Sequence, residues 1–344
     1  MVRMRTLPLL LVSLSLSAQI MVAPVPQDPH ELVTGMARLL TEPADRANAM
    51  ALLEKAKQNA DMHMPGAAPF AVKIVLNVSG NGANTGTGEI TETWLNGRNW
   101  RYDQTLGSYS ETRVAGPGQT FGKHAGYTPM AVQMVRASMF WPVGGNPSVN
   151  VIRTADATWN GKPVTAILLA GGQDRVYPGR HWVDTEYVVD NATGLLQIYS
   201  RAPGTYVVYG YSKGIRFHGR SMPDSITIFM GGNQVVEAQL VNIQDAGNVD
   251  AAFLKPDSQM HPDGPASVGM NMRFPLNAPD PTNSGVLKQV IIHATIDNQG
   301  NVVDSQLSAT ADSALVEPAL DLVKKAKFSP GSPMDAYINV RFGL

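Results

Sequence analysis

The sequence contains no cysteine, and this absence excludes several kinds of chemistry at once. A chain without cysteine has no disulfide framework, no thiolate metal site, no cysteine nucleophile and no lipid-modified N-terminal cysteine. Charge is also scarce, because charged residues make up 16% of the 344 residues, against roughly 25% in an average soluble domain. With 27 basic and 28 acidic residues, the net charge of −1 argues against a nucleic-acid-binding protein, which would carry a basic face.

The apolar content and the length of the chain indicate a folded protein with two domains. Apolar residues make up 44% of the chain, which is too many for a disordered protein. A chain of this length forms a core large enough to be stable without disulfides. Glycine and proline are frequent, with 32 and 24 residues, which predicts many turns.

Residues 1–23 have the pattern of an export signal. Arg3 and Arg5 supply positive charge, and a mostly apolar stretch runs from Leu7 to Leu16. Two interpretations remain open: a signal peptide that is cleaved, or an uncleaved inner-membrane anchor over residues 7–23, which is at the short end of the length that spans a bilayer. Both place the rest of the chain outside the cytoplasm.

Residues 24–68 are predicted to be helical. Leu32, Met36, Leu39 and Leu40 repeat at the spacing of one helix face, and a second periodic run ends near Ala56. Thr41–Asp45 interrupts the two runs, because Pro43 disfavours a helical residue before it. Pro65-Gly66 ends the segment.

Residues 69–255 are predicted to form a large antiparallel sheet. Segments that alternate apolar and polar residues, such as Phe70–Val78, recur at intervals of roughly ten residues between turn signals. Asn96-Gly97 is a strong hairpin signal. One stretch differs, because residues 128–140 have helical spacing and follow Pro129. We therefore expect a barrel or a strongly curved sheet around one helix.

The order of motifs in this region resembles the outer-membrane lipoprotein carrier and receptor fold of the LolA and LolB type. The residues that carry the resemblance are Glu186–Asp190, Thr193–Leu195, Tyr206–Tyr211, Gly214–Pro223, Asp224–Phe229, Gly231–Asn233, Val241–Ile243, Asp250 and Phe253. The resemblance implies an open antiparallel barrel around a helix, with an apolar cavity for a lipid-like ligand. The lipobox cysteine of the receptor branch is absent.

The last part of the chain is predicted to be a linker and a small domain. Residues 256–284 contain six prolines and two glycines, a composition typical of a linker. Residues 285–344 then predict two strands at 286–296 and 301–309, a helix near 315–326 and a last strand at 336–342. This order is a ββαβ domain.

The ββαβ segment resembles the TonB C-terminal domain. The residues that carry this resemblance are Val290–Val302, Ala314–Val323, Lys327–Pro330 and Ile338–Phe342. The family implies a periplasmic module that binds a partner by pairing a strand with an exposed sheet edge. The Tyr-Pro that usually opens the family's domain and the long Pro/Lys-rich rod of a transducer are both missing, which makes classical energy transduction doubtful.

Motifs for catalysis and metal binding are weak. Gly210–Gly214 matches the G-x-S-x-G elbow around Ser212, but the residues after it do not have helical spacing. The glycine-rich stretch Gly80–Gly88 leads into a strand, so no helix N-terminus faces a phosphate. The seven histidines show no metal-ligand spacing. We therefore assign no catalytic, cofactor-binding or metal-binding residue, and no cofactor.

The sequence thus predicts an α+β protein: a curved antiparallel sheet or half-barrel around a helix, followed by a small ββαβ domain. The first functional hypothesis is a non-enzymatic, TonB-like periplasmic adaptor that binds an envelope or outer-membrane protein. The alternative is a periplasmic carrier or sensor of lipid or other apolar ligands. A more remote hypothesis is a serine hydrolase that uses Ser212. No nucleic-acid partner is expected, and a homodimer stays open.

Overall fold

The computed structural model describes residues 38–80, 84–116, 118–143, 151–170, 182, 184–250, 252–262, 269–282, 284, 286–310, 312–331 and 333–343. The predicted export signal at residues 1–23 lies outside the described residues. No helix in the described ranges is both long enough and apolar enough to cross a membrane.

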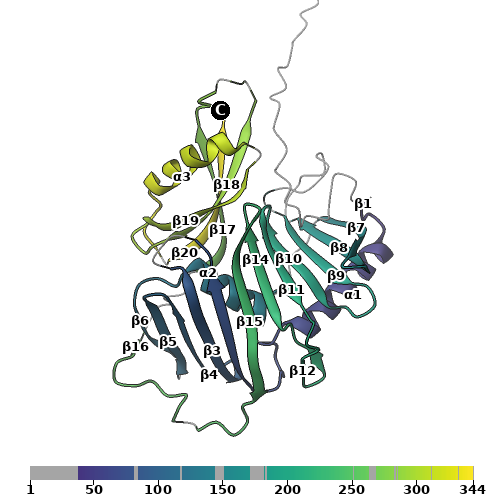
Figure 1. The fold of residues 1–344 in the computed structure, drawn as a ribbon, viewed down its shortest axis with the longest axis vertical. Coiled ribbons are helices and arrows are strands. Elements are labelled where there is room, and N and C mark those ends of the chain that lie inside the picture. Colours follow the sequence, from purple (N-terminus) through teal and green to yellow (C-terminus); the bar gives the residue numbers. More distant parts are fainter. Residues whose placement is uncertain are drawn as a thin grey trace, which may run out of the picture.

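One large antiparallel sheet dominates the molecule (Figure 1). Its strand order is β1-β7-β8-β9-β10-β11-β14-β15-β2-β3-β4-β5-β6-β16. The strands are β1 (Arg38–Leu39), β2 (Phe70–Val78), β3 (Gly86–Asn96), β4 (Asn99–Leu106), β5 (Tyr109–Gly116), β6 (Gln119–His124), β7 (Val151–Trp159), β8 (Lys162–Ala170), β9 (Thr185–Asp190), β10 (Leu196–Ala202), β11 (Thr205–Gly210), β14 (Ser225–Met230), β15 (Asn233–Asp245) and β16 (His261–Pro262). A separate small hairpin pairs β12 (Arg216–Phe217) with β13 (Arg220–Ser221).

The alternating pattern of the sequence sets which face of each strand is buried. In β2 the side chains of Phe70, Ile74 and Leu76 are fully buried, and the residues between them are more exposed. The predicted hairpin turn at Asn96 is confirmed, since β3 ends there, β4 begins at Asn99, and the Asn96 Oδ1 accepts a hydrogen bond from the Arg98 N–H at 2.9 Å.

Two helices pack on the buried face of the sheet. Helix α1 (Pro43–Ala60) has a proline in its first turn, where no N–H partner is lost. Pro43, which was predicted to interrupt the helical segment, is therefore the start of this helix. The helix predicted before Pro43 is wrong at β1. Helix α2 (Met130–Phe140) follows Pro129, as predicted, and buries most of its side chains. The main apolar core lies between these helices and the sheet.

The C-terminal part of the chain, residues 269–343, is called the C-terminal module below. It contains β17 (Gly269–Ala278), β18 (Lys288–Ile296), β19 (Val302–Thr310), the short 3-10 helix η1 (Ser313–Leu315), α3 (Val316–Lys325) and β20 (Met334–Phe342). The sheet order is β17-β20-β18-β19. The two strands, helix and final strand predicted after residue 285 are all present.

The linker predicted at residues 256–284 is wrong for residues 269–278, which form β17. This strand pairs in parallel with β20, from Gly269 opposite Met334 to Ala278 opposite Phe342. Its proline, Pro275, lies in an edge strand, which is the place in a sheet where a missing N–H is tolerated. The turn-like composition hid a strand whose partner lies about sixty residues further along the chain.

The predicted α+β class is also wrong. The structure is 52% strand and 16% helix, so the fold is mainly β. The large sheet is open and is not a closed barrel, because the short strands β1 and β16 end it at opposite edges. From Pro43 onward, the helical spacings in the sequence marked helices of only 18, 11 and 10 residues. These helices cover parts of the sheet and do not form a layer of their own.

Candidate ligand-binding site

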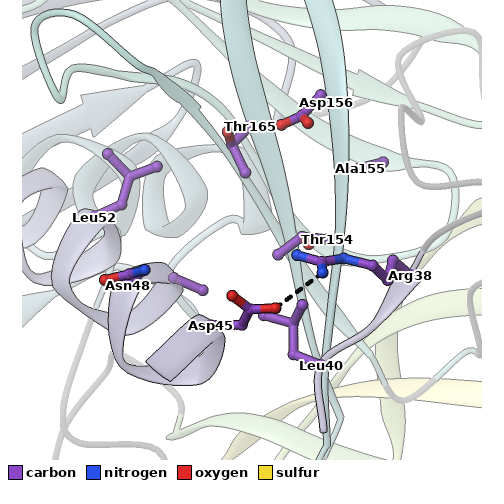
Figure 2. Close-up of a pocket in the computed structure, with 10 residues that line it drawn as sticks. Arg38, Leu40, Asp45, Asn48, Leu52, Thr154, Ala155, Asp156 and Thr165 are labelled. Atoms are coloured by element: carbon purple, nitrogen blue, oxygen red, sulfur yellow. Dashed lines mark hydrogen bonds and ion pairs between the residues drawn. The ribbon is translucent and has the colours of Figure 1, made fainter. Parts of the chain in front are cut away.

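A hollow lies between α1 and the strands β7 and β8 (Figure 2). Its volume is about 640 Å³, within the range of roughly 300–1,000 Å³ that is usual for small-molecule sites. Leu40, Ala49 and Leu52 give it an apolar side, and Thr154, Asp156 and Thr165 line the side of the sheet. This mixture of surfaces suits a molecule with an apolar body and a polar end.

An ion pair bounds the hollow. An Nη1 hydrogen of Arg38 is donated to Oδ2 of Asp45 at 2.9 Å, and both side chains are at least one-third exposed. A pair with this exposure contributes about 1 kcal/mol or less. It therefore connects β1 to the first turn of α1 without holding them together firmly.

The contact of α1 with the sheet is small for a helix of 18 residues. Its fully buried apolar side chains are Ala49, Leu53 and Ala56, and Met50 and Leu52 pack half-buried against the same core. Burial of a leucine side chain contributes about 1.5–3 kcal/mol, and an alanine contributes less. The core cluster that contains these side chains also includes apolar residues of the sheet such as Val189 and Leu196, which are fully buried. A weakly held helix thus covers an apolar part of the sheet.

The polar anchors of α1 are concentrated at its C-terminal end. The Val143 N–H donates to Oδ1 of Asp61 at 3.2 Å, and the Met62 N–H donates to the Phe140 carbonyl at 2.7 Å. Arg220 donates to the Asp61 carbonyl at 2.7 Å. These bonds join the end of α1 to the end of α2 and to β13.

Asp61 itself is 4% exposed. Burial raises the pKa of its carboxyl to about 6, against the opposing effects of the Val143 N–H, Lys57 and Arg220. The joint between α1 and the rest of the fold therefore contains an ionisable group that titrates near neutral pH.

A second polar cluster fixes α2 to the sheet. Nε and Nη2 of Arg136 donate to Oε2 of Glu92 at 3.0 and 2.9 Å, and the Nε2 of His63 lies 2.7 Å from the other oxygen. Burial opposes ionisation of Glu92, but the charges of Arg136 and His63 and their hydrogen bonds outweigh it and lower its pKa. The Arg136 guanidinium also lies 3.9 Å from the centre of the Tyr102 ring. The cluster is fully paired, so it positions α2 and has no free group for a ligand.

Within the part of the chain that the structure describes, side chains occupy the interior of the curved sheet, where the sequence predicts a large apolar cavity. Side chains of α2, among them Val132, Val135 and Phe140, fill it and are fully buried. Between α2 and the C-terminal module there is room for only about 30 Å³, the size of one water molecule. The hollow at α1 is therefore the better candidate for a ligand.

The C-terminal module is fixed to the end of the large sheet by hydrogen bonds, and we call this contact the seam. The hydroxyls of Thr205 and Ser308 are 2.6 Å apart, the Gly231 N–H donates to the Ser308 carbonyl at 2.9 Å, and Tyr127 donates to Asn298 at 3.0 Å. A buried apolar cluster also crosses the seam and joins Ala202 of β10 to Ile291, Ala309 and Tyr337 of the C-terminal module.

The seam also buries two ionisable side chains. His293 and Asp335 are 3% and 4% exposed, and the His293 Nε2 lies 3.8 Å from an Asp335 oxygen. Burial raises the pKa of Asp335 to about 7, while burial and the charge of Arg201 lower the pKa of His293 to about 3. Between these values both side chains are neutral in the folded protein.

One of the two sheet edges that the predicted ββαβ module could offer to a partner is occupied. Without β17, β20 would form an edge of the C-terminal sheet, but β17 pairs along its length. The outer strand on that side is then β17 itself, where Pro275 has no N–H to donate. Binding of a partner by strand addition to β20 would require displacement of β17.

Ser212 does not have the surroundings of a nucleophile. Its hydroxyl donates to the Asp224 carboxylate, at 3.3 Å from each oxygen, and the Lys213 N–H donates to the same group at 2.6 Å. The residues after it form the short β12–β13 hairpin and not the helix that an elbow needs. Within the described ranges, no three His, Cys, Asp or Glu side chains are placed to hold a metal ion.

Sequence reasoning missed the residues that matter most here. Asp61 was not singled out, because an isolated acid after a helix has no distinctive spacing. Arg136 and Glu92 are 44 residues apart and meet only in the folded chain. The charge of Arg136 inside an apolar helical stretch was the one available signal, since a buried charge requires a partner.

Comparison with known proteins gives no family assignment. No protein-family model matches the chain, and no curated protein sequence matches it. Solved structures that it resembles include a LolA-superfamily protein from Nitrosomonas europaea, with 10% identity and a TM-score of 0.38 over 60% of this chain and 97% of the other. A domain described as an outer membrane lipoprotein-sorting protein from Vibrio parahaemolyticus has 9% identity and a TM-score of 0.35 over 60% and 97%.

A complex of MucA and MucB from Pseudomonas aeruginosa is also similar, with 14% identity and a TM-score of 0.22 over 64% of this chain and 63% of the other. The LolA type that the strand order resembles is thus among these structures. None of the comparisons supports a TonB C-terminal domain. Because the TM-scores are below 0.5, these likenesses carry no conclusion about function.

Proposed function

We propose that the protein is a non-enzymatic carrier or sensor of an apolar or amphipathic ligand in the bacterial cell envelope. One observation carries this proposal: a helix with three buried apolar side chains covers an apolar part of the sheet, beside an open hollow of about 640 Å³. The export signal pattern at residues 1–23 supports a place outside the cytoplasm.

The ligand binds between α1 and the strands β7 and β8 in this proposal. Its apolar part contacts Leu40, Ala49 and Leu52, and its polar end lies near Asp156 and Thr165. Movement of α1 away from the sheet enlarges the site, and the modest apolar burial of the helix and the hydrogen bonds at its C-terminal end oppose this movement. The adaptor hypothesis is less well supported, because β17 already pairs with β20.

A titration of the full chain with a fluorescent fatty acid tests the proposal. Leu52→Asp places a charge in the hollow, and we expect it to weaken binding of the probe about tenfold or more, since burial of an unpaired charge is costly. Ala51→Asp is the matched control, because Ala51 is the neighbouring residue on α1 and is exposed. We expect it to change the affinity by less than about twofold.

Two results would contradict the proposal. One is a wild-type protein that does not bind the probe and from which native mass spectrometry and solvent extraction recover no apolar molecule. The other is an equal loss of affinity in both variants, because the probe would then bind elsewhere.

A further inference from the structure

The C-terminal end of α1 is attached through a buried carboxyl group. Asp61 is the first residue after the helix, and its own N–H donates to the Lys57 carbonyl at 2.8 Å. Its side chain is turned into the protein, where it accepts a hydrogen bond from the Val143 N–H. Among the described residues, this is the only hydrogen bond to the carboxyl oxygens, which is few for a buried carboxylate.

The groups that face Asp61 do not neutralise it fully. Lys57 and Glu54 of α1 act on it in opposite directions, and Arg220 of β13 is bonded to its main-chain carbonyl and not to its carboxylate. The two aromatic neighbours, Tyr187 of β9 and Tyr209 of β11, have pKa values that burial raises well above the ordinary value, so both are uncharged.

Position on the helix adds to the cost of a charge at this site. The C-terminal end of a helix carries partial negative charge, so a carboxylate there is destabilising, typically by about 0.3–1 kcal/mol. A neutral carboxylic acid avoids this cost and the cost of desolvation, and it gains a proton with which it can donate a hydrogen bond. Ionisation of Asp61 therefore weakens the attachment of α1.

We infer that Asp61 is a pH-sensitive latch that holds α1 closed over the apolar part of the sheet when it is protonated and releases the helix when it ionises. The inference rests on the proposed function for the role of α1 as a cover. It adds that the exchange of ligand is regulated by pH: the closed state retains a ligand in an acidic compartment, and the ligand exchanges more readily at neutral or alkaline pH.

The direction of the pH effect follows from the linkage between proton binding at Asp61 and the closed position of α1. The pKa of Asp61 is about 6 when α1 is closed, and it returns toward the ordinary value of 3.8 when the end of the helix is exposed to water. The closed state then binds the proton more tightly, so a low pH favours it. For these two values, the ratio of closed to open molecules falls about tenfold between pH 5 and pH 8.

Distance measurements on spin-labelled protein test the latch directly, and without ligand. Because the chain has no cysteine, Ala51→Cys and Gln239→Cys introduce two unique labelling sites, both exposed, on α1 and on β15. In this labelled protein we expect one distance at pH 5 and a second, longer distance that grows as the pH rises to 8. Asp61→Asn keeps an acceptor for the Val143 N–H but cannot ionise, so it should stay closed at both pH values.

Glu42→Gln in the same labelled protein is the matched control, because it removes an exposed carboxylate from the start of the same helix, where the side chain makes no capping hydrogen bond. It should retain the pH response. Asp61→Ala provides a second neutral variant in case the amide disturbs the fold, and it should also lose the response.

Unchanged distances in the wild type between pH 5 and pH 8, or a full response in both neutral variants, would overturn the inference. This test is independent of the carrier proposal. If the distances respond to pH but the protein does not bind the fatty-acid probe, the role of Asp61 is supported and the carrier function is contradicted.

Discussion

Gly204 and Ser308 meet at the seam so closely that no other residue fits at position 204. A Cβ atom on Gly204 would lie 1.9 Å from the Ser308 carbonyl oxygen, and the φ of Gly204 is +73°. The turn between β10 and β11 is therefore shaped to fit against β19. This contact joins the C-terminal module to the large sheet.

Gly204→Ala should destabilise the seam. We expect the variant to lower the free energy of unfolding by about 2–4 kcal/mol, because it combines a steric clash with a left-handed backbone conformation. Gly214→Ala is the control, since Gly214 has a φ of +60° but nothing within 4 Å of its Cβ position. It should cost about 1 kcal/mol. Urea unfolding of both variants measures the difference, and equal costs would show that the seam does not constrain position 204.

Arg136→Met should be strongly destabilising. The variant leaves the Glu92 carboxylate, 1% exposed, without its main counter-ion, which costs about 3–5 kcal/mol for a buried pair. Lys73→Met breaks the exposed pair between Lys73 and Glu89 and should cost about 1 kcal/mol or less. Denaturant unfolding at neutral pH measures the change in the free energy of unfolding for both variants.

The double variant Arg136→Met/Glu92→Met tests whether this cost comes from the unpaired charge. Because it removes both charges, it should be more stable than Arg136→Met alone. If the loss of unfolding free energy in the double variant equals the sum of the losses in Arg136→Met and Glu92→Met, the ion pair is not the source of the lost stability.

Asp335 should make the folded protein less stable as the pH rises toward 7. Its pKa is about 7 in the fold and 3.8 as the ordinary value, so between these values the folded state holds a proton that the unfolded state has released. His293 acts in the opposite direction between about pH 3 and 6.5, since only the unfolded chain is protonated there. Above pH 6.5, only the effect of Asp335 remains in this pair.

Asp335→Asn isolates this effect, because the amide oxygen can still accept the hydrogen bond from the Thr295 hydroxyl. We expect the stability of the variant relative to the wild type to increase between pH 5 and pH 8. Urea unfolding at several pH values measures the difference. A constant difference over this range would mean that Asp335 does not change its charge there.

Leu53→Ala should loosen α1 more than the rest of the fold. Leu53 is the most deeply buried large side chain of α1, so its truncation should lower the opening free energy of the α1 amides by about 2–3 kcal/mol in hydrogen exchange. Leu76→Ala, at a fully buried position of β2, should lower the protection of the whole sheet. If Leu53→Ala lowers the protection of all amides equally, α1 unfolds with the core and is not a separate cover.

The sequence predicted local structure well where the pattern of side chains had one clear period. The alternation in Phe70–Val78 and the turn at Asn96 specified β2 and the hairpin after β3, because each depends on residues that are neighbours in the chain. The helix near 128–140 was found for the same reason. Short helices were given too much weight in the fold class, since periodicity shows that a helix forms but not what share of the fold it contributes.

The candidate site was not predictable from the same patterns. Strand β17 was read as a linker because prolines dominate its surroundings, and only pairing with β20 makes Gly269–Ala278 a strand. The contacts of Asp61 with Val143 and of Glu92 with Arg136 join residues far apart in the sequence.

By itself, then, the amino-acid sequence determined the strands with a clear alternating pattern, the turn at Asn96 and the absence of cysteine chemistry, because these follow from the type and spacing of nearby residues. Only the tertiary structure decided which carboxyl groups are buried, which sheet edge is occupied and where a hollow remains. Burial and pairing depend on distant segments that pack together, and it is burial that changes the pKa values of Asp61 and Asp335.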